Sequence, residues 1–291
     1  MKEIGIVLAI LVLLYVIWQA YELQQFRITR YEIENSKINH AMRIVLLADL
    51  HCHTFGKNNE RLLRAIRKEK PDVILIPGDL IMDKHPEKYE FAADFIRSIA
   101  DICPIYFSRG NNESRVSDYP VSENGKRYMK VEKEMKEAGC HILSNSHVTT
   151  IIRGNPLMIY GLELDRGFYT KGVKIHMRPE NMTERLGECD TTECNLLLAH
   201  NPAFSEQYAQ WGADLTVCGH NHGGLICIPG IGSIISPQFE FFPKYSFGQF
   251  DIDEHQVIIS RGLGTHTFHI RIFNRAEIVT IDMKPDLKHK P

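Results

Sequence analysis

The amino-acid sequence predicts an α/β fold, in which helices cover a parallel sheet, preceded by a single apolar helix. Three observations lead to this prediction. Short apolar runs alternate with helical patterns between residues 42 and 218, as in successive βαβ units. After Gly224 the helical periodicity stops, and the remaining apolar runs have the length of strands. Residues 4–21 are almost entirely apolar and carry no charge.

Strands and helices are expected to alternate along most of the chain. The expected strands are 43–48, 73–77, 105–107, a pair within 151–161, 195–199, 214–218, 257–259 and 278–281. The expected helices are 59–70, 87–100, 127–138 and 202–210. This order predicts one domain at residues 42–283, with no internal boundary. Residues 23–41 are predicted to be a polar linker, which could leave the membrane as a short strand, and residues 284–291 are predicted to be a disordered tail.

Residues 1–22 are predicted to be a transmembrane anchor. A span of about 20 apolar residues crosses the hydrocarbon core of a bilayer. Tyr15, Trp18 and Tyr21 are of the residue types that gather at the membrane interface. A cleaved signal peptide is the alternative interpretation. The apolar stretch is long for a signal peptide, however, and no small-x-small cleavage site follows it.

The charges around the apolar stretch indicate which side of the membrane the domain occupies. Arg27, Arg30 and Lys37 follow the stretch, whereas Lys2 before it is offset by Glu3. By the positive-inside rule the domain is expected on the cytoplasmic side of the cell membrane. The odd number of cysteines, seven, with no CxxC pair, points to free thiols and argues against an oxidising compartment.

The overall composition is that of a folded globular protein. Among 291 residues, 44% are hydrophobic and 24% are charged, and the formal net charge is −2. A nucleic-acid-binding protein usually has a basic excess, so nucleic acid is not an expected partner. The 14 histidines, several of them beside Asp, Asn or Gly, indicate metal chemistry.

Five short motifs made of metal-binding residue types each follow a predicted strand. They are Asp49-Leu-His51, Gly78-Asp79, Gly110-Asn111-Asn112-Glu113, His200-Asn201-Pro202 and Gly219-His220-Asn221-His222-Gly223. Most of them, taken alone, have an ordinary explanation as a turn or a helix entry. In open α/β sheets, however, ligands bind beyond the carboxyl ends of the strands. Five motifs at five strand ends therefore predict one shared site.

The ordered series Asp-x-His, Gly-Asp, Gly-Asn-(His)-Glu, His and Gly-His-x-His resembles the signature of the calcineurin-like metallophosphoesterases. The resemblance extends from residue 44 to about residue 281, and residues 260–264 and 271–274 resemble the membrane-anchored bacterial branch. It implies a two-sheet α/β/β/α sandwich with the site at the sheet edge. It also implies hydrolysis of phosphomonoesters, phosphodiesters or pyrophosphates.

The resemblance further implies two divalent metal ions that share one carboxylate. The residues that it assigns to the first ion are Asp49, His51, Asp79 and His222. The residues that it assigns to the second are Asp79, Asn111, His200 and His220. Carboxylate, imidazole and amide ligands suit Mn²⁺, Fe or Zn²⁺. Such a pair of ions activates water near neutral pH and stabilises the charge that develops during phosphoryl transfer.

The chain departs from the family pattern at Asn112, where the family has a His that is understood to protonate the leaving group. Asn cannot release a proton at neutral pH. Either the enzyme uses another acid or good leaving groups, or the protein is a catalytically weak, metal-dependent binder of phosphate esters. The nearest substitute in the sequence is His53, and His266 and His269 are weaker candidates.

The expected partners are the membrane, through residues 1–22, and a phosphate-ester substrate. A membrane tether favours a lipid-linked substrate but identifies none. A DNA-processing member of the same superfamily is disfavoured by the apolar span and the slightly acidic charge balance.

Overall fold

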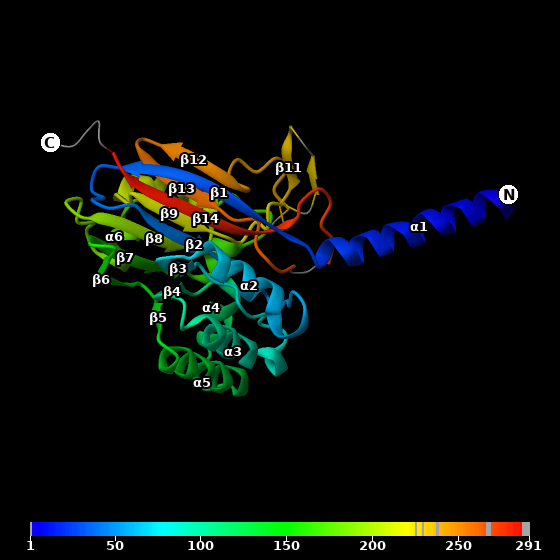
Figure 1. The fold of residues 1–291 in the computed structure, drawn as a ribbon, viewed down its shortest axis with the longest axis horizontal. Coiled ribbons are helices and arrows are strands. Elements are labelled where there is room, and N and C mark those ends of the chain that lie inside the picture. The colour runs from blue at the N-terminus through cyan, green and yellow to red at the C-terminus, as the bar shows by residue number, and fades with distance from the viewer. Residues whose placement is uncertain (1, 225, 229, 237–238, 266–268, 287–291) are drawn as a thin grey trace.

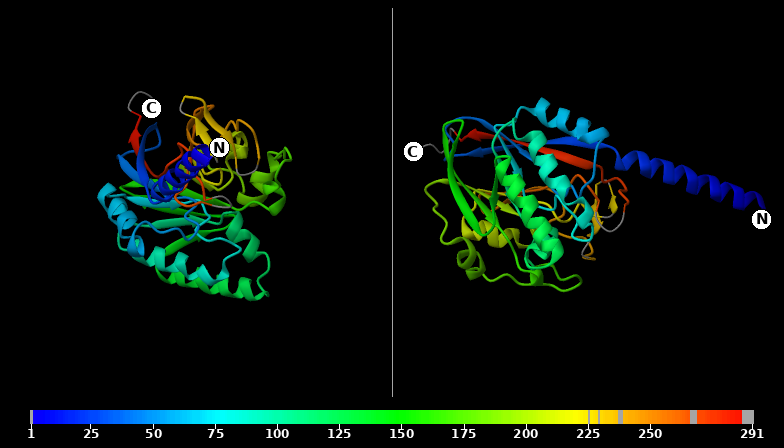
Figure 2. Two further views of the ribbon diagram at one scale, coloured as in Figure 1. Left: turned by 90° about the vertical axis from the view of Figure 1, so that its right-hand side faces the viewer. Right: turned by 90° about the horizontal axis from the view of Figure 1, so that it is seen from below.

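Two six-stranded sheets lie face to face in the computed structural model of the chain, and helices cover both outer faces (Figures 1 and 2). The structure describes residues 2–286, except residues 225, 229, 237–238 and 266–268. This architecture confirms the predicted two-sheet α/β/β/α sandwich, preceded by one apolar helix.

The first sheet combines strands from both ends of the chain. In spatial order its strands are β1 (Phe26–Asn35), β14 (Ala276–Pro285), β2 (Met42–Leu46), β3 (Val73–Ile76), β4 (Ile105–Ser108) and β5 (Cys140–Leu143). Strands β2 to β5 are parallel, and β14 runs antiparallel to β2. Helices α2 (Glu60–Glu69), α3 (Glu90–Ile99) and α5 (Glu123–Glu137) cover its outer face.

The second sheet comes from the second half of the chain. In spatial order its strands are β12 (Gly248–Ile252), β13 (His255–Ile259), β9 (Leu215–Cys218), β8 (Cys194–Ala199), β7 (Asn155–Leu162) and β6 (Ser146–Ile152). Strands β7, β8, β9 and β13 are parallel. Helices α6 (Glu180–Leu186) and α7 (Ser205–Trp211) cover its outer face. A separate hairpin consists of β10 (Ile226–Ile228) and β11 (Gly232–Ile235).

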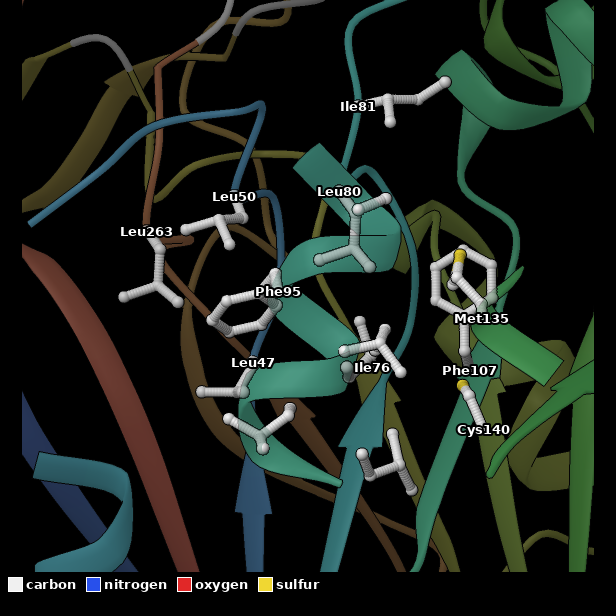
Figure 3. Packing of buried hydrophobic residues seen from close by; sticks show 14 of the residues in the cluster. Leu47, Leu50, Ile76, Leu80, Ile81, Phe95, Phe107, Met135, Cys140 and Leu263 are labelled. Atoms are coloured by element: carbon white, nitrogen blue, oxygen red, sulfur yellow. The ribbon is translucent and has the colours of Figure 1, made fainter. Parts of the chain in front are cut away.

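The apolar core fixes the loops that leave the strand ends. Leu47 and Leu50, which stand on either side of Asp49, belong to the cluster beneath α3, where Figure 3 shows them near Phe95. Leu80, which follows Asp79, belongs to the same cluster and is fully buried. Burial of each Leu side chain contributes roughly 1.5–3 kcal/mol to the stability of the folded state. The polar residues between these side chains are therefore held at fixed positions.

The predicted strands and helices all have counterparts, with ends that shift by a few residues. The largest shift is at the start of the strand pair, where β6 begins at Ser146 and not at residue 151. Helix α5 begins at Glu123 and not at residue 127, because Ser122 caps it by accepting a hydrogen bond from the amide of Gly125. Among the elements that were not predicted are α4 (Asn111–Ser117), β5 and α6.

Of the two interpretations of residues 23–41, a linker or a short strand, the structure shows the strand, because Phe26–Asn35 form β1. Over its ten residues β1 pairs in parallel with β14. Phe26 and Ile28 pack against the apolar cluster under the helices, and Ile33 is buried between the sheets. The domain therefore begins near Phe26. Several of the charged residues that made this segment resemble a linker form ion pairs with buried carboxylates, such as Arg30 with Glu69 at 2.6 Å.

The predicted tail also begins too early. Lys284 and Pro285 are the last residues of β14 and pair with the end of β1, so the ordered chain extends past residue 283. The rest of the predicted tail, residues 287–291, lies outside the described residues.

Helix α1 (Lys2–Leu23) projects from one end of the sandwich (Figure 1). It is long and apolar enough to cross a membrane, with a mean hydropathy of 2.3 over an 18-residue window. At 1.5 Å per residue it is roughly 33 Å long, about the thickness of a bilayer core. Its last turn is not a free tether, because Gln19 and Glu22 are buried against the domain.

The role of β1 gives a prediction about truncated chains. A chain that begins at Asn39 should be less stable than one that begins at Gln24, although both lack α1. Removal of β1 leaves the outer edge of β14 unpaired, and the fully buried Glu277 loses Arg27 and Thr29. Breaking a buried ion pair lowers the free energy of unfolding by about 3–5 kcal/mol. Because Arg27 is half exposed, we expect a loss at the lower end, about 3 kcal/mol.

For a domain of this size that loss corresponds to a decrease in Tm of roughly 6–12 °C. Thermal unfolding followed by circular dichroism measures it. Equal Tm values for the two truncated chains would show that β1 is the linker after all.

Candidate metal centre

All five motifs lie at the same edge of the sandwich, beyond the carboxyl ends of parallel strands. The first three follow β2, β3 and β4 of the first sheet, and the last two follow β8 and β9 of the second. The two sheets face each other at this edge. Residues far apart in the sequence are thereby brought into one cluster.

Two contiguous groups of buried side chains in this cluster can each hold a metal ion. Asp49, His51 and His222 form one group, and Asp49, Asp79 and His200 form the other; within each group the ligand atoms all lie within 4.8 Å of one another. His51 Nε2 is 3.1 Å from His222 Nε2, and His200 Nε2 is 3.3 Å from Asp79 Oδ2. None of the five is more than 8% exposed.

Asp79 connects the two groups. Its Oδ2 atom lies 3.7 Å from His51 Nε2 on one side and 3.3 Å from His200 Nε2 on the other. Asp49 also contacts both, at 3.8 Å from His200 and 3.9 Å from His222. The geometry is therefore compatible with a bridging role for Asp79, and it also places Asp49 close to both sides.

Asn111 and His220 complete the set predicted from the sequence. Asn111 Oδ1 is buried, and no hydrogen-bond partner for it lies within the described residues. Burying an acceptor without a partner costs free energy, which a bound metal ion would offset. The ring of His220 lies 5.0 Å from that of His200, centroid to centroid, and its backbone amide donates to both oxygens of Asp49 at 3.0 Å.

Backbone carbonyls orient two of the imidazoles. His200 Nδ1 lies 2.8 Å from the carbonyl oxygen of Pro77, and His51 Nδ1 lies 3.2 Å from that of Ile81. A carbonyl can only accept, so each Nδ1 carries a proton and each Nε2 points into the cluster. This is the usual second-layer arrangement around metal-binding histidines.

Asn112 is fixed on Asp79 and is fully buried. Its backbone amide donates to Asp79 Oδ1 at 2.9 Å, and its side-chain amide donates to Asp79 Oδ2 at 2.6 Å. Its own Oδ1 accepts from the amide of Asp83 at 3.1 Å. In this structure Asn112 orients the Asp79 carboxylate, and its amide has no acidic proton to give to a leaving group.

Glu113 is a functional residue to which sequence reasoning gave no role. Its carboxylate accepts from the backbone amides of Gly110, Asp79 and Ile81 at 2.8–3.1 Å. Burial raises its pKa to about 8. Glu113 therefore joins the loop after β3 to the start of α4. A Glu three residues after the Gly that precedes a helix is a capping-box signal, but the bonds across to the other loop cannot be read from the sequence.

Several residues of the cluster adopt left-handed backbone conformations. Asp49, His51, Asp79, His220 and His222 have φ angles between 49° and 70°. Such conformations cost of order 1–3 kcal/mol each and concentrate at functional sites. They turn side chains away from the strand direction and into the space beyond the strand ends.

The two glycines of the Gly78-Asp79 and Gly110-Asn111 motifs are required because the loops touch. A Cβ atom at Gly78 would lie 2.2 Å from the backbone nitrogen of Gly110, and one at Gly110 would lie 2.2 Å from Asp79 Oδ1. Both distances are far below contact. Close approach of the two backbones therefore places Asp79 beside Asn112.

The electrostatics of the cluster favour bound cations. Burial raises the pKa of Asp49 above its usual range. Burial acts in the same direction on Asp79, but His200, His51 and the backbone amide of Asn112 together outweigh burial and hold the pKa of Asp79 well below its usual range. In turn burial lowers the pKa of His200, but Asp79 and Asp49 outweigh burial and raise it to about 9. The two buried carboxylates thus hold positive charge beside them.

Arg271 supports the cluster from a second layer that the sequence did not reveal. Its guanidinium group is fully buried and donates to the carbonyl oxygens of Arg261, Gly262 and Gly264 at 2.6–3.1 Å. The amide of Gly264 donates to the carbonyl of Asp49 at 2.6 Å. Arg271 therefore holds the loop against which Asp49 packs.

The two described candidates for a substitute acid, His53 and His269, do not join the cluster. His53 Nε2 lies 3.0 Å from the carbonyl oxygen of Leu23, at the end of α1, and burial lowers the pKa of His53. His269 is exposed and bonds to Thr265 at 2.7 Å. His266 lies outside the described residues.

Comparison with known proteins is consistent with this site. The family model described as calcineurin-like phosphoesterase matches residues 42–224. The chain is 26% identical over 262 residues to the phosphodiesterase YaeI of Escherichia coli (strain K12), covering 89% of this chain and 88% of that protein. It is 22% identical over 261 residues to the uncharacterized metallophosphoesterase YkuE of Bacillus subtilis (strain 168), covering 88% of this chain and 85% of that protein.

Two further relatives match over about half of their own length. A transmembrane protein with metallophosphoesterase domain from Danio rerio is 25% identical over 252 residues, covering 84% of this chain and 53% of that protein. The crystal structure of a 5′-nucleotidase precursor from Thermus thermophilus shares the fold, with a TM-score of 0.51 and 14% identity, covering 77% of this chain and 49% of that chain. The chain therefore belongs to the calcineurin-like phosphoesterase family and is a phosphoesterase of the kind that depends on a dinuclear metal site.

Proposed function

We propose that this phosphoesterase binds its two divalent ions through the seven side chains predicted from the sequence, with Asp79 between the ions. The observation that carries the proposal is the pair of contiguous, buried ligand groups beyond the strand ends. The assigned residues are Asp49, His51, Asp79, Asn111, His200, His220 and His222. When bound, the ions supply Lewis acidity to the phosphoryl oxygens and activate water.

The protein's own residues hold this site in shape. Asn112 and Glu113 fix the loop that carries Asp79, and the carbonyls of Pro77 and Ile81 fix two imidazoles. Because these groups are positioned before substrate binds, no reorganisation is required during phosphoryl transfer.

We further propose that the physiological substrate is a phosphodiester, pyrophosphate or other ester with a good leaving group, presented at a membrane. The support is that Asn112 cannot donate a proton to the leaving oxygen and that His53 bonds to the end of α1. The apolar helix α1 supports a lipid-linked substrate. A relative named a phosphodiesterase supports the diester class.

The second candidate function, a catalytically weak binder of phosphate esters, rests on the same Asn112. Turnover of an activated aryl phosphodiester in the presence of Mn²⁺ separates the two. Both ions bound without measurable turnover would favour the binder.

The shared position of Asp79 gives the first prediction for this site. Asp79→Ala should lose both metal ions, because this carboxylate lies between the two groups. Activity should fall on the order of 10³-fold or more, since several kcal/mol of stabilisation by the metal ions is lost. Metal analysis of the purified protein measures the stoichiometry. Asp101→Ala, at an exposed carboxylate that pairs with Arg67, is the matched control and should retain both ions. Two equivalents retained in Asp79→Ala would contradict the assignment.

Asn112 gives a prediction about leaving groups. A positioned acid contributes about 10²–10⁴-fold, and an alkoxide leaving group needs it far more than a phenolate does. Wild-type turnover of aryl esters and pyrophosphates should therefore exceed that of alkyl monoesters. Asn112→His should raise alkyl-ester turnover more than aryl-ester turnover.

The control for this experiment is His53→Ala, which should leave the ratio of alkyl to aryl turnover unchanged, because His53 is engaged by Leu23. Two results would refute the leaving-group argument. One is an equal effect of Asn112→His on both substrate classes, and the other is a selective loss of alkyl turnover in His53→Ala.

We also propose that α1 is an uncleaved anchor and that the domain lies on the cytoplasmic side. The basic residues after the span support this, as do the seven free cysteines. Protease added to intact cells should leave the domain whole, and the same protease should digest it after lysis. Digestion in intact cells would reverse the orientation, and recovery of a chain that starts near Gln24 would show cleavage.

A further inference from the structure

We propose that a group of exposed apolar side chains at the foot of α1 is a second membrane contact, which places the metal centre at the level of the lipid headgroups. This inference rests on the proposed membrane anchor and goes beyond it. The side chains, called here the apolar rim, are Ile231, Phe239, Phe241, Phe242, Ile270 and Phe273. Each is between 40% and 69% exposed.

The first observation is that the apolar rim is joined to the last turn of α1. Gln19 Nε2 donates to the carbonyl of Arg271 at 3.2 Å, and the amide of Arg271 donates to Gln19 Oε1 at 3.1 Å. Ile270 and Phe273 flank this pair of hydrogen bonds in the sequence. Arg275 adds an ion pair with Glu22 at 2.6 Å. The rim residues near Arg271 are therefore fixed relative to the helix.

The second observation is that the hairpin carries the rest of the rim to the same place. Ile226 of β10 pairs with Ile272, and the amide of Cys227 donates to the carbonyl of Ile272 at 3.2 Å. Ile235 of β11 in turn pairs with Phe241. Figures 1 and 2 both show this hairpin at the end of the sandwich from which α1 projects.

The position of the apolar rim along α1 indicates that the rim contacts the membrane interface. Trp18 and Tyr21 stand beside the docked residues Gln19 and Glu22, and Tyr15 lies one turn earlier with its ring 5.9 Å from that of Trp18. Aromatic residues at one end of an apolar helix mark the boundary between hydrocarbon and headgroups. Because Gln19 bonds to Arg271, the apolar rim lies at this boundary whenever α1 spans the bilayer.

One basic contact also suits a lipid surface. The ammonium group of Lys171, an exposed residue, lies over the ring of Phe239 at 5.4 Å from its centroid. Apolar side chains interleaved with lysine are the composition of segments that lie in the headgroup region. Surfaces with several exposed aromatic rings are otherwise uncommon on soluble domains.

The apolar rim is directly continuous with the metal centre. Asn274 donates from Nδ2 to the carbonyls of His222 and Gly224, at 2.6 Å each. The hairpin strand β10 begins at Ile226, a few residues after His222. His220, which is half-buried, is the most exposed member of the proposed ligand set. A substrate whose phosphate lies at the membrane surface would reach the site without leaving the bilayer.

The experiment introduces a tryptophan reporter into the full-length chain in vesicles of neutral and anionic phospholipids with brominated acyl chains. The variants are Phe242→Trp and, independently, Phe273→Trp. The matched control is Ile151→Trp, which replaces a similarly exposed apolar residue (72%) of β6, a strand that Figure 1 shows far from α1. The turn beside Ile151 contacts the distal end of β1, where the amides of Asn39 and His40 donate to Asn155 Oδ1.

The emission added by each reporter is measured as the difference from the unsubstituted chain, which contains Trp18 and Trp211. The expected result is quenching of more than half of the added emission for both rim variants and none for Ile151→Trp. Reporters that are shielded from water but not quenched by brominated lipids would show that a second copy of the chain covers the rim, and would overturn the proposal.

Flotation of the vesicles separates the two levels of the proposal. Protein that floats with the vesicles but whose rim reporters behave like Ile151→Trp retains its anchor and lacks the second contact. Protein that does not float overturns the anchor and the rim contact together. Neither result depends on metal content or on hydrolysis, so both are distinguishable from a failure of the proposed chemistry.

Discussion

Two carboxylates, Asp49 and Asp79, lie almost completely out of contact with water, and the rest of the site is arranged around their charge. A buried carboxylate is costly unless cations or hydrogen-bond donors surround it. Here both are present: backbone amides of His220 and Asn112 point at the oxygens, and imidazoles lie beside them. Bound metal ions would complete this compensation, so binding of the ions and order at the sheet edge would depend on each other.

The same constraint explains the second layer. Asp49 is held from behind by the loop of Gly262 and Gly264, where a Cβ atom at Gly262 would lie 2.8 Å from Asp49 Cβ. That loop is held by the buried Arg271, whose backbone bonds to Gln19 of α1. A continuous set of contacts therefore joins the apolar helix to the Asp49 carboxylate. In this chain helix α1 is part of the architecture of the site.

What could be predicted from the sequence was local, and what could not depended on distant partners. The sequence placed Asp49, Asp79 and His220 at one edge because each motif directly follows its own apolar strand, and the structure brings these residues together there. Residues 26–35 could not be decided between a strand and a linker, because their pattern is polar and their order comes from β14, about 250 residues later. The start of α4 resembled a turn because Gly110-Asn111-Asn112 favours one, whereas the structure has a capping box there, with Glu113 also bonded to the neighbouring loop. The tie between Arg271 and Gln19 has no sequence signal at all.

The central claim is that one cluster of seven side chains holds two metal ions with Asp79 between them. Anomalous diffraction from crystals of the manganese-loaded, full-length protein tests it most directly. We expect two peaks roughly 3.5–4 Å apart, the spacing of dinuclear sites, with the Asp79 carboxylate in contact with both. A single peak, or two peaks of which one lies away from these side chains, would contradict the account.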